Sequence, residues 1–330
     1  MIQHPGVLAL LLASGLVSLL LAAAGWQGIR ILRGWNLRSG SDAQLDLERR
    51  TYLVSTLVAN GLVIQILSLF LFIFTADGLA PQFVGAMCAA GSLSANAFGY
   101  PTLLVKLATC LVAGVWLLLH RADTQGHDYP LIRPKYALLL VLTPLVLAET
   151  VLQALYLTGL KADVMTSCCG SLFGQGRPGL AAELAGLPPR IMQPVFWVTL
   201  ALLSAVGIWL LRRRQGAALF SGLSLTFLLV AVTALISFFC LYIYELPTHH
   251  CPFCLLHREY FFVGYPIYGA LLGGAIAGLG VGILAPFHGR ASLKTVLPGL
   301  QAHLAWSTLI LALAFALIVG VWMVLSPLSL

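Results

Sequence analysis

Eight long apolar stretches constrain the fold of this chain more than any other feature of its sequence. The hydrocarbon core of a bilayer is about 30 Å thick, so a helix needs roughly 20 apolar residues to cross it. The candidate spans are Val7 to Trp26, Tyr52 to Thr75, Thr102 to His120, Tyr136 to Leu160, Val195 to Leu211, Ala217 to Leu246, Cys254 to Leu284 and His303 to Leu325. The sequence therefore predicts an all-α, polytopic membrane helix bundle.

Composition supports the same class, because 60% of the residues are hydrophobic and only 9% are charged. The net charge of +7 does not indicate nucleic-acid binding, since the basic residues are scattered in short connections rather than clustered on one face. We expect residues 1–330 to form a single integral membrane domain. A cleaved signal peptide is the alternative for the first span, although no Lys or Arg precedes it.

The basic residues also predict an orientation. Most of the 18 lysines and arginines lie in the odd-numbered connections between spans. These are Arg30, Arg33, Arg38, Arg49, Arg50, Arg121, Arg133, Lys135, Arg212, Arg213, Arg214, Arg290 and Lys294. By the positive-inside rule these connections are cytoplasmic, and both termini lie outside.

Five of the seven cysteines fall in the even-numbered connections, which this orientation places on the outer face. They are Cys88, Cys168, Cys169, Cys251 and Cys254. In a bacterial inner membrane that face meets the oxidising periplasm, where thiols pair or take part in redox cycles. The other two, Cys110 and Cys240, lie within spans, where a small apolar packing role is expected.

The most specific motif is Cys251-Pro252-Phe253-Cys254, at the predicted start of the seventh span. A Cys-x-x-Cys at a helix N-terminus has a lowered thiol pKa and an enriched, nucleophilic thiolate. Arg258 follows one helical turn after Cys254, with His257 beside it. We expect these two side chains to stabilise a thiolate or to hold the carbonyl oxygen of a membrane quinone, ubiquinone or menaquinone.

This segment resembles the DsbB family of membrane disulfide-generating proteins. In that family a Cys-x-x-Cys opens a transmembrane helix on the periplasmic side, and an Arg four residues after the second Cys contacts ubiquinone. Cys251, Cys254 and Arg258 match that pattern in type and spacing. The resemblance implies a thiol–disulfide oxidoreductase that exchanges electrons between a periplasmic thioredoxin-like or other thiol protein and the quinone.

A second segment, from Cys88 to Pro101, looks like the vitamin K epoxide reductase family, in which an outer-loop Cys precedes a Phe-Gly-x-Pro. The resemblance implies that Cys88 relays electrons to the Cys-x-x-Cys. It also suggests two sub-blocks, residues 52–211 of the vitamin K reductase type and residues 217–325 of the DsbB type. The alternative is that Phe98-Gly99-Tyr100-Pro101 only starts a helix, with proline in the first turn.

The adjacent pair Cys168 and Cys169 presents a geometric problem. Neighbouring Cα atoms lie about 3.8 Å apart, less than the usual disulfide range of about 4.4–6.8 Å, so each cysteine is expected to pair with a more distant one. The loop would then act as a moving arm, like the second cysteine pair of the DsbB family. A static disulfide between loops is the alternative.

Glu149 lies near the middle of the fourth span, with Gln153 one turn later. A carboxylate at mid-bilayer is costly and is a functional candidate by default. It could conduct protons to the quinone or only hydrogen-bond a neighbouring helix. Lys106, roughly a turn into the third span, is a possible partner of Glu149, but its place nearer the outer face argues against a direct pair.

Two other functions stay open. His249, His250, Cys251, Cys254 and His257 form a dense set of donors for copper or zinc, which suggests metal or haem handling or transport. The chain could also be a structural subunit of a larger membrane complex, with disulfides that brace its loops. In each case the expected partners are membrane lipid and other membrane subunits, and not nucleic acid.

Overall fold

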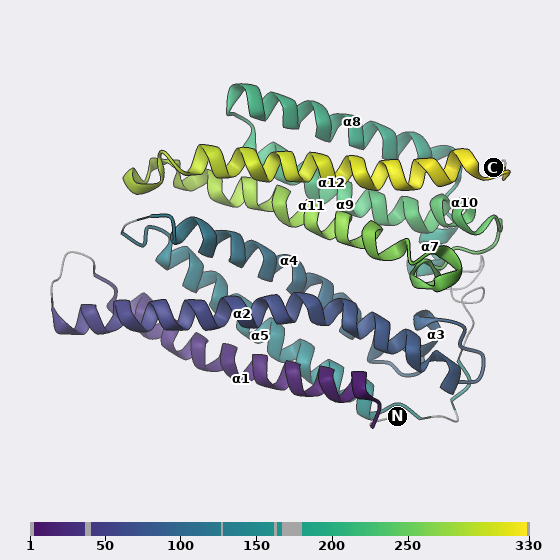
Figure 1. Cartoon of the computed structure of the whole chain (residues 1–330), viewed down its shortest axis with the longest axis horizontal. Coiled ribbons are helices and arrows are strands. Elements are labelled where there is room, and N and C mark those ends of the chain that lie inside the picture. Colours follow the sequence, from purple (N-terminus) through teal and green to yellow (C-terminus); the bar gives the residue numbers. More distant parts are fainter. Residues whose placement is uncertain (1–2, 37–40, 127, 162–163, 167–179, 329–330) are drawn as a thin grey trace. The chain divides into compact units, whose positions relative to one another are not determined.

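A computed structural model of the chain describes residues 3–36, 41–126, 128–161, 164–166 and 180–328. Eight helices in these ranges are long and apolar enough to cross a membrane, so the predicted all-α, multi-pass architecture is confirmed. They are α1 (Pro5–Gly34), α2 (Asp42–Leu79), α4 (Gly99–Asp123), α5 (Ile132–Thr158), α8 (Pro189–Arg213), α9 (Ala217–Ala234) with its continuation, α11 (Gly264–Leu284) and α12 (Leu297–Leu325). Figure 1 labels them along the chain.

Shorter elements connect these helices. A π-helical turn, Leu235–Phe239, joins α9 to α10 (Cys240–Tyr244) within one span. The remaining helical elements are α3 (Ala89–Leu93), α7 (Leu180–Ala185) and the 3₁₀ turns Ala80–Gln82, Cys254–Leu256, Arg258–Tyr260, Ala285–Gly289 and Ala291–Leu293. Among the described residues, the only β pairing is an isolated parallel bridge between Val84 and Met165.

The chain forms two compact units. Unit 1 comprises Met1–Ala76, Ala95–Ala162 and Phe287–Leu297, and holds α1, most of α2, α4 and α5. Unit 2 comprises Asp77–Ser94, Asp163–Pro286 and Pro298–Leu330, and holds α8 to α12 together with α3 and α7. Each unit therefore contains four long helices.

The first and second four long helices of the chain share an order of elements. In each set a cysteine-bearing segment lies between the second and third long helices, and each third helix begins with Gly-Tyr-Pro, at Gly99 in α4 and at Gly264 in α11. Proline is well tolerated in the first turn of a helix, because its missing N–H would be unpaired there in any case. The Cys88 and Cys251–Cys254 segments thus occupy corresponding places in the order of elements, and both belong to unit 2.

Unit 1 packs α5 along both α1 and α4. Leu139, Leu142 and Val146 of α5 are fully buried in its core, with Val58 and Leu62 of α2. In unit 2, α9 packs along α8 and α11. Its core includes a cluster of aromatic rings formed by Phe196, Phe227, Phe239 and Phe315.

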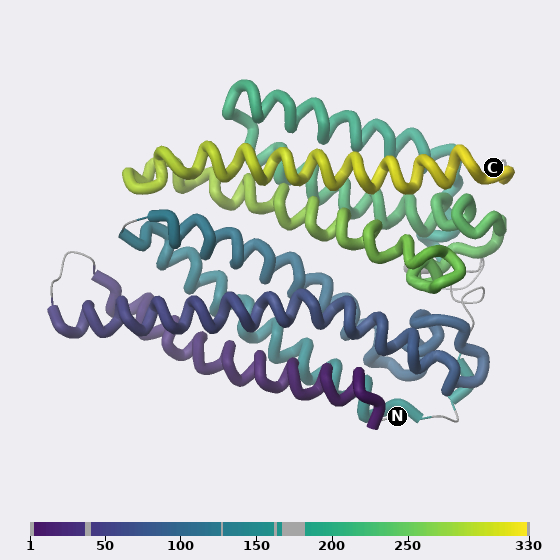
Figure 2. The backbone as a smooth tube through the Cα atoms, viewed as in Figure 1, coloured from purple at the N-terminus to yellow at the C-terminus, as the bar shows by residue number. Residues whose placement is uncertain are grey.

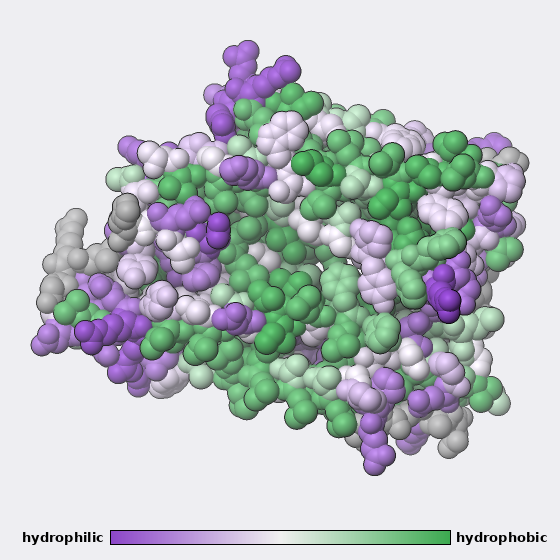
Figure 3. Space-filling view, in the orientation of Figure 1, coloured by the Kyte–Doolittle hydropathy of each residue, from purple (hydrophilic) through white to green (hydrophobic). Residues whose placement is uncertain are grey.

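Apolar side chains remain on the outside of the helices, as expected for surfaces that face lipid. Leu16, Leu19, Leu67, Leu317 and Val324 are all more than half exposed. On the face shown in Figure 3, hydrophobic residues mostly cover the middle of the helices and hydrophilic residues gather toward helix ends.

The seventh span begins ten residues later than predicted, at Gly264 instead of Cys254. Between these residues the backbone curls through two 3₁₀ turns, and Phe261 and Phe262 adopt left-handed φ angles of 54° and 55° (Figure 2). The intervening polar residues include Arg258 and Glu259, both exposed. Because charges inside a span are costly, this segment stays outside the long helix.

Candidate thiol site

Three sulfur atoms come together in unit 2. The Sγ atoms of Cys88, Cys251 and Cys254 all lie within 4.8 Å of one another, and those of Cys88 and Cys251 are 3.5 Å apart. The three residues are buried, with exposed fractions of 0%, 0% and 6%. Residues 163 positions apart in the sequence thus have their sulfurs in van der Waals contact.

Cys88 is held at the N-terminus of the short helix α3, in an extended conformation. Asp77, in the last turn of α2, accepts the backbone N–H of Ala89 at 2.9 Å. Before Cys88 the chain turns at Gly85, whose φ is +90° and where a Cβ atom would approach the carbonyl oxygen of Thr166 to 2.5 Å. A glycine is required by both the conformation and the contact.

Side chains of the neighbouring helices hold the backbone of the Cys251–Cys254 motif. The Tyr244 hydroxyl donates to the Cys251 carbonyl at 2.6 Å, and the Tyr268 hydroxyl donates to the Pro252 carbonyl. His250 Nδ1 lies 2.9 Å from the carbonyl oxygen of Ile236, in the π-helical turn. These bonds satisfy buried polar groups and fix the position of the sulfurs.

Asp77 also contacts His257. Its Oδ1 atom is 2.8 Å from His257 Nε2, and the backbone N–H of His257 donates to the Cys254 carbonyl at 3.1 Å. The pKa of His257 is raised by its hydrogen bond to Asp77 and by the charges of Asp77, Cys88 and Glu259, and burial opposes this rise. Asp77 therefore joins the Cys88 turn to the Cys254 turn.

His249 is the second imidazole near Cys88. Burial lowers the pKa of His249, and the charge of Cys88 acts in the opposite direction. Its ring lies edge-on to Tyr244, with the ring centres 4.6 Å apart. A thiolate at Cys88 would thus favour the protonated forms of both His249 and His257.

The other predicted site residues have different outcomes. Arg258 is exposed and lies in a 3₁₀ turn distinct from that of Cys254, so the expected α-helical face shared by these two residues does not form. Glu149 belongs to unit 1. Cys168 and Cys169 lie outside the described residues.

Sequence reasoning missed Asp77, Tyr244 and Tyr268. Asp77 could have been found, since it is a carboxylate at the end of a span shortly before a cysteine. Tyr244 and Tyr268 stand out by no sequence motif, and only the fold turns their hydroxyls toward the cysteine segment.

Three buried sulfurs at these distances can exchange disulfide bonds, and they also suit a soft metal ion such as Cu(I). The predicted set of donors fits a metal less well than the sulfurs do. One ring nitrogen of His250 lies next to a backbone carbonyl and one of His257 is paired with Asp77, and neither histidine belongs to the group formed by the three sulfurs. Among the described residues, only Cys88, Cys251 and Cys254 form a group with metal-ligand spacing.

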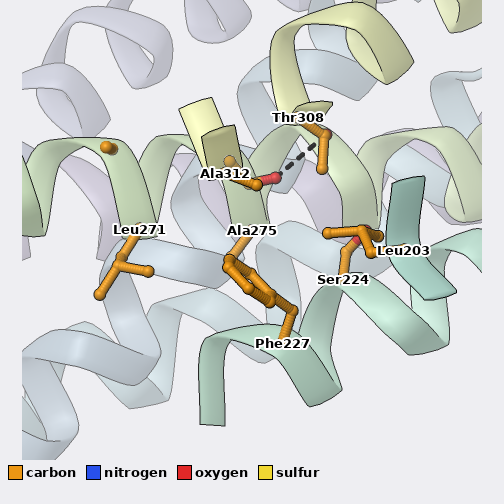
Figure 4. A pocket seen from close by; sticks show the side chains of 9 residues that line it. Leu203, Ser224, Phe227, Leu271, Ala275, Thr308 and Ala312 are labelled. Carbon is orange, nitrogen blue, oxygen red and sulfur yellow. Dashed lines mark hydrogen bonds between the residues drawn. The ribbon is translucent and has the colours of Figure 1, made fainter. Parts of the chain in front are cut away.

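Unit 2 also has a small hollow between α8, α9, α11 and α12 (Figure 4). Its lining is apolar except for Ser224 and Thr308. Both hydroxyls donate to backbone carbonyls within or beside their helices, at 2.8 Å for Ser224 and 3.0–3.1 Å for Thr308. The hollow therefore offers no charged or sulfur-bearing group, and both of its hydroxyls already donate to backbone carbonyls.

Comparison of the chain with protein-family models, with curated proteins and with solved structures gives no match.

Proposed function

We propose that this multi-pass membrane protein is a thiol–disulfide oxidoreductase that moves electrons between thiols of a partner protein and a membrane quinone. The observation that carries the proposal is the convergence of Cys88, Cys251 and Cys254 within 4.8 Å. Cys88 comes from a different segment than the other two, which is the arrangement that a disulfide relay needs. The resemblances to the DsbB and vitamin K epoxide reductase families support the same chemistry.

The exchange step is a substitution at sulfur. The Cys88 thiolate attacks Sγ of Cys251 in a Cys251–Cys254 disulfide, a Cys88–Cys251 bond forms, and Cys254 leaves as a thiolate that takes up a proton. The reverse step returns the disulfide to the Cys251–Cys254 pair. His257, held by Asp77, stabilises the Cys88 thiolate. The same arrangement of sulfurs allows the exchange to run forward or in reverse.

The quinone is inferred from the resemblance and from the charge of Arg258. As the Cys251–Cys254 disulfide forms, the two thiols give up two electrons and two protons, and a quinone held near Arg258 would supply the oxidising capacity for this step. The exposed Arg258 guanidinium can hold a quinone carbonyl oxygen, because it is a permanently charged donor.

In this proposal the cysteines face the periplasm of a bacterial inner membrane, with both chain termini on the same side. Cys168 and Cys169 would pass electrons between Cys88, whose side chain is buried, and a soluble thioredoxin-like protein. The positive-inside distribution of the basic residues supports this orientation.

The test is the redox state of the Cys251–Cys254 pair in purified protein, measured by differential thiol labelling and mass spectrometry before and after addition of quinone. We expect the reduced pair to become a disulfide, with an equivalent amount of quinol formed. The Cys240→Ser variant is the matched control, since Cys240 is buried nearby and should not be needed. Unchanged thiols and no quinol would refute the proposal.

Binding of a soft metal ion is the second candidate, favoured by the same three sulfurs. It predicts one Cu(I) or Zn(II) per chain after mild purification, lost in Cys88→Ser, Cys251→Ser and Cys254→Ser alike. Elemental analysis separates it from thiol exchange, which predicts no stoichiometric metal.

A further inference from the structure

Unit 1 contains a buried ion pair that was not expected from the sequence. Lys106 Nζ lies 2.6 Å from Glu149 Oε1, and both side chains are 1% exposed. Gln65 Nε2 donates to the same oxygen at 2.5 Å, and Lys106 also donates to Ser68 Oγ at 3.0 Å. The ammonium is 5.4 Å from the centre of the Phe72 ring, close enough for a cation–π interaction.

The pair lies deep in the membrane. Glu149 precedes the end of α5, Thr158, by nine residues, which is about 14 Å of helix and close to the midplane of a bilayer core of about 30 Å. The prediction that Lys106 and Glu149 do not meet is wrong. Helix α4 starts at Gly99 and not at Thr102, so Lys106 lies about one turn deeper than predicted. Its long side chain covers the remaining distance to the Glu149 carboxylate.

Unpartnered polar atoms gather around this pair. Within the described part of the chain, twelve buried side-chain nitrogen or oxygen atoms lack a hydrogen-bond partner, and eight of them are on α2, α4 and α5 of unit 1. Two of the eight, Thr51 Oγ1 and His120 Nδ1, lie toward the end of unit 1 opposite the start of α4. The other six are Gln65 Oε1, Thr75 Oγ1, Thr109 Oγ1, Glu149 Oε2, Gln153 Oε1 and the Tyr156 hydroxyl. Buried polar groups are normally satisfied by protein or ordered water, so this concentration indicates hydration.

The surroundings of Glu149 differ on its two sides along α5. Toward the end of the helix, Gln153 and Tyr156 follow on the same face, and Asn96 of the half-buried connecting loop donates to the Tyr156 carbonyl at 2.9 Å. Toward the start of the helix, Val146 and Leu142 are fully buried and apolar. One side therefore has polar groups up to the surface of unit 1, and on the other an apolar layer at Val146 and Leu142 separates Glu149 from the polar groups near the start of α5.

Unit 2 indicates that the fold of a four-helix unit does not require this charge. Counting seven residues from the glycine of Gly-Tyr-Pro leads to Lys106 in α4 and to Leu271 in α11. Leu271 lines the apolar hollow of unit 2 shown in Figure 4. At the corresponding position, one unit thus has a buried charge and the other an ordinary apolar side chain.

We propose that the Lys106–Glu149 pair is a proton-exchange site inside the membrane, reached by water only from the end of unit 1 at which α4 begins. Water delivers a proton to Glu149 Oε2, and Oε1 continues to accept from Lys106 and Gln65. The reverse step returns the proton to water, so no oxidant, reductant or other reactant is needed. A metal cation would be repelled by the Lys106 ammonium, and an apolar ligand would leave the oxygens unpaired.

The apolar layer at Leu142 and Val146 makes this a one-sided site and not a channel. A polar path across the whole membrane would dissipate the proton gradient of a cell. A path that ends at Glu149 allows the carboxylate to hold a proton without letting it cross. This inference is independent of the proposed thiol chemistry, since it concerns only residues of unit 1.

Infrared spectroscopy of the purified protein tests the exchange. As the pH is lowered, we expect a carboxylic-acid C=O band that shifts in D₂O, present in wild type and absent in Glu149→Gln. Glu245→Gln, at an exposed position, is the matched control and should keep the band. A wild-type spectrum that lacks any band removed by Glu149→Gln would overturn the proposal.

Proteoliposomes that contain a pH-sensitive dye test the one-sided access. Wild type should hold an imposed pH difference, whereas the double variant Leu142→Ser/Val146→Ser should dissipate it at least several-fold faster. Adding Glu149→Gln to the double variant should restore the slow decay of the pH difference seen with wild type. A leak in the wild-type protein, or a leak in the double variant that persists without Glu149, would contradict a one-sided site centred on this carboxylate.

Discussion

Asp77 Oδ1 lies 2.8 Å from His257 Nε2 and 2.9 Å from the backbone nitrogen of Ala89, the residue after Cys88. One carboxylate oxygen therefore connects two turns that each carry a cysteine of the three-sulfur cluster. Because His257 also donates its backbone N–H to the Cys254 carbonyl, the alignment of the sulfurs depends on this contact. Asp77 and His257 act by positioning, and their effect should depend on pH.

Asp77→Asn should lower the pKa of His257. Asp77 raises that pKa above the ordinary value of 6.5, so the contact stabilises the folded state below about pH 6.5, and this stabilisation is lost as the pH rises through the folded-state pKa. Histidine NMR titration, with His257→Gln to assign the signal, measures the shift. Asp46→Asn, which removes an exposed carboxylate on α2, should leave the titration unchanged. An unaltered His257 titration in Asp77→Asn would show that the contact is unimportant.

Removing Cys254 should trap a disulfide between the two segments. With Cys254→Ser, Cys251 loses its partner in the motif, and the sulfur of Cys88 lies 3.5 Å away. We expect mild oxidation to give a Cys88–Cys251 disulfide in most of the protein, detected by mass spectrometry of digested, alkylated samples. The same treatment of Cys254→Ser/Cys88→Ser should give none. If the single variant forms no such bond, the two segments do not meet as described.

Gly264 sets the distance between α11 and the cysteine motif. A Cβ atom there would lie 3.0 Å from the backbone carbonyl carbon of Leu255 and 2.9 Å from a Leu256 methyl group. Gly264→Ala should destabilise the protein by about 1–3 kcal/mol, as overpacking does, and should reduce Cys88–Cys251 cross-linking in the Cys254→Ser background. Gly269→Ala, in the same helix with no atom within 4 Å of the added Cβ, is the control. Equal unfolding midpoints for the two variants would contradict the close contact.

The spans could be predicted because a helix that crosses lipid must be long and apolar, and such a helix is a continuous apolar run in the sequence. Their ends were less predictable where polar residues adjoin them. The apolar run after Cys254 was counted as part of the seventh span, although Arg258 and Glu259 keep it outside the helix. Conversely, α4 gained its first turn from Gly99 and Tyr100, which hydropathy alone does not assign to a span.

The pairings were harder to predict than the spans. The sequence singled out Cys88, Cys251 and Cys254 by residue type and by their expected side of the membrane, and the fold brings their sulfurs together. The sequence did not predict the distances between these sulfurs, because four long helices separate the Cys88 segment from the Cys251–Cys254 segment along the chain. Asp77 was overlooked for the same reason, since its partners, Ala89 and His257, are identified only by tertiary structure.

The Lys106–Glu149 pair leads to a prediction about stability. Lys106→Met leaves a buried carboxylate without its cation, and Glu149→Gln leaves a buried ammonium without its anion, so each should destabilise the protein by about 3–5 kcal/mol. The double variant removes both charges and should be destabilised by less than the sum of the two, as measured by unfolding in detergent micelles. Lys135 and Asp123, a second buried pair in unit 1, provide a comparison through Lys135→Met and Asp123→Asn. If the effects of Lys106→Met and Glu149→Gln simply add, the two side chains are not coupled, and the proton-exchange site loses its structural basis.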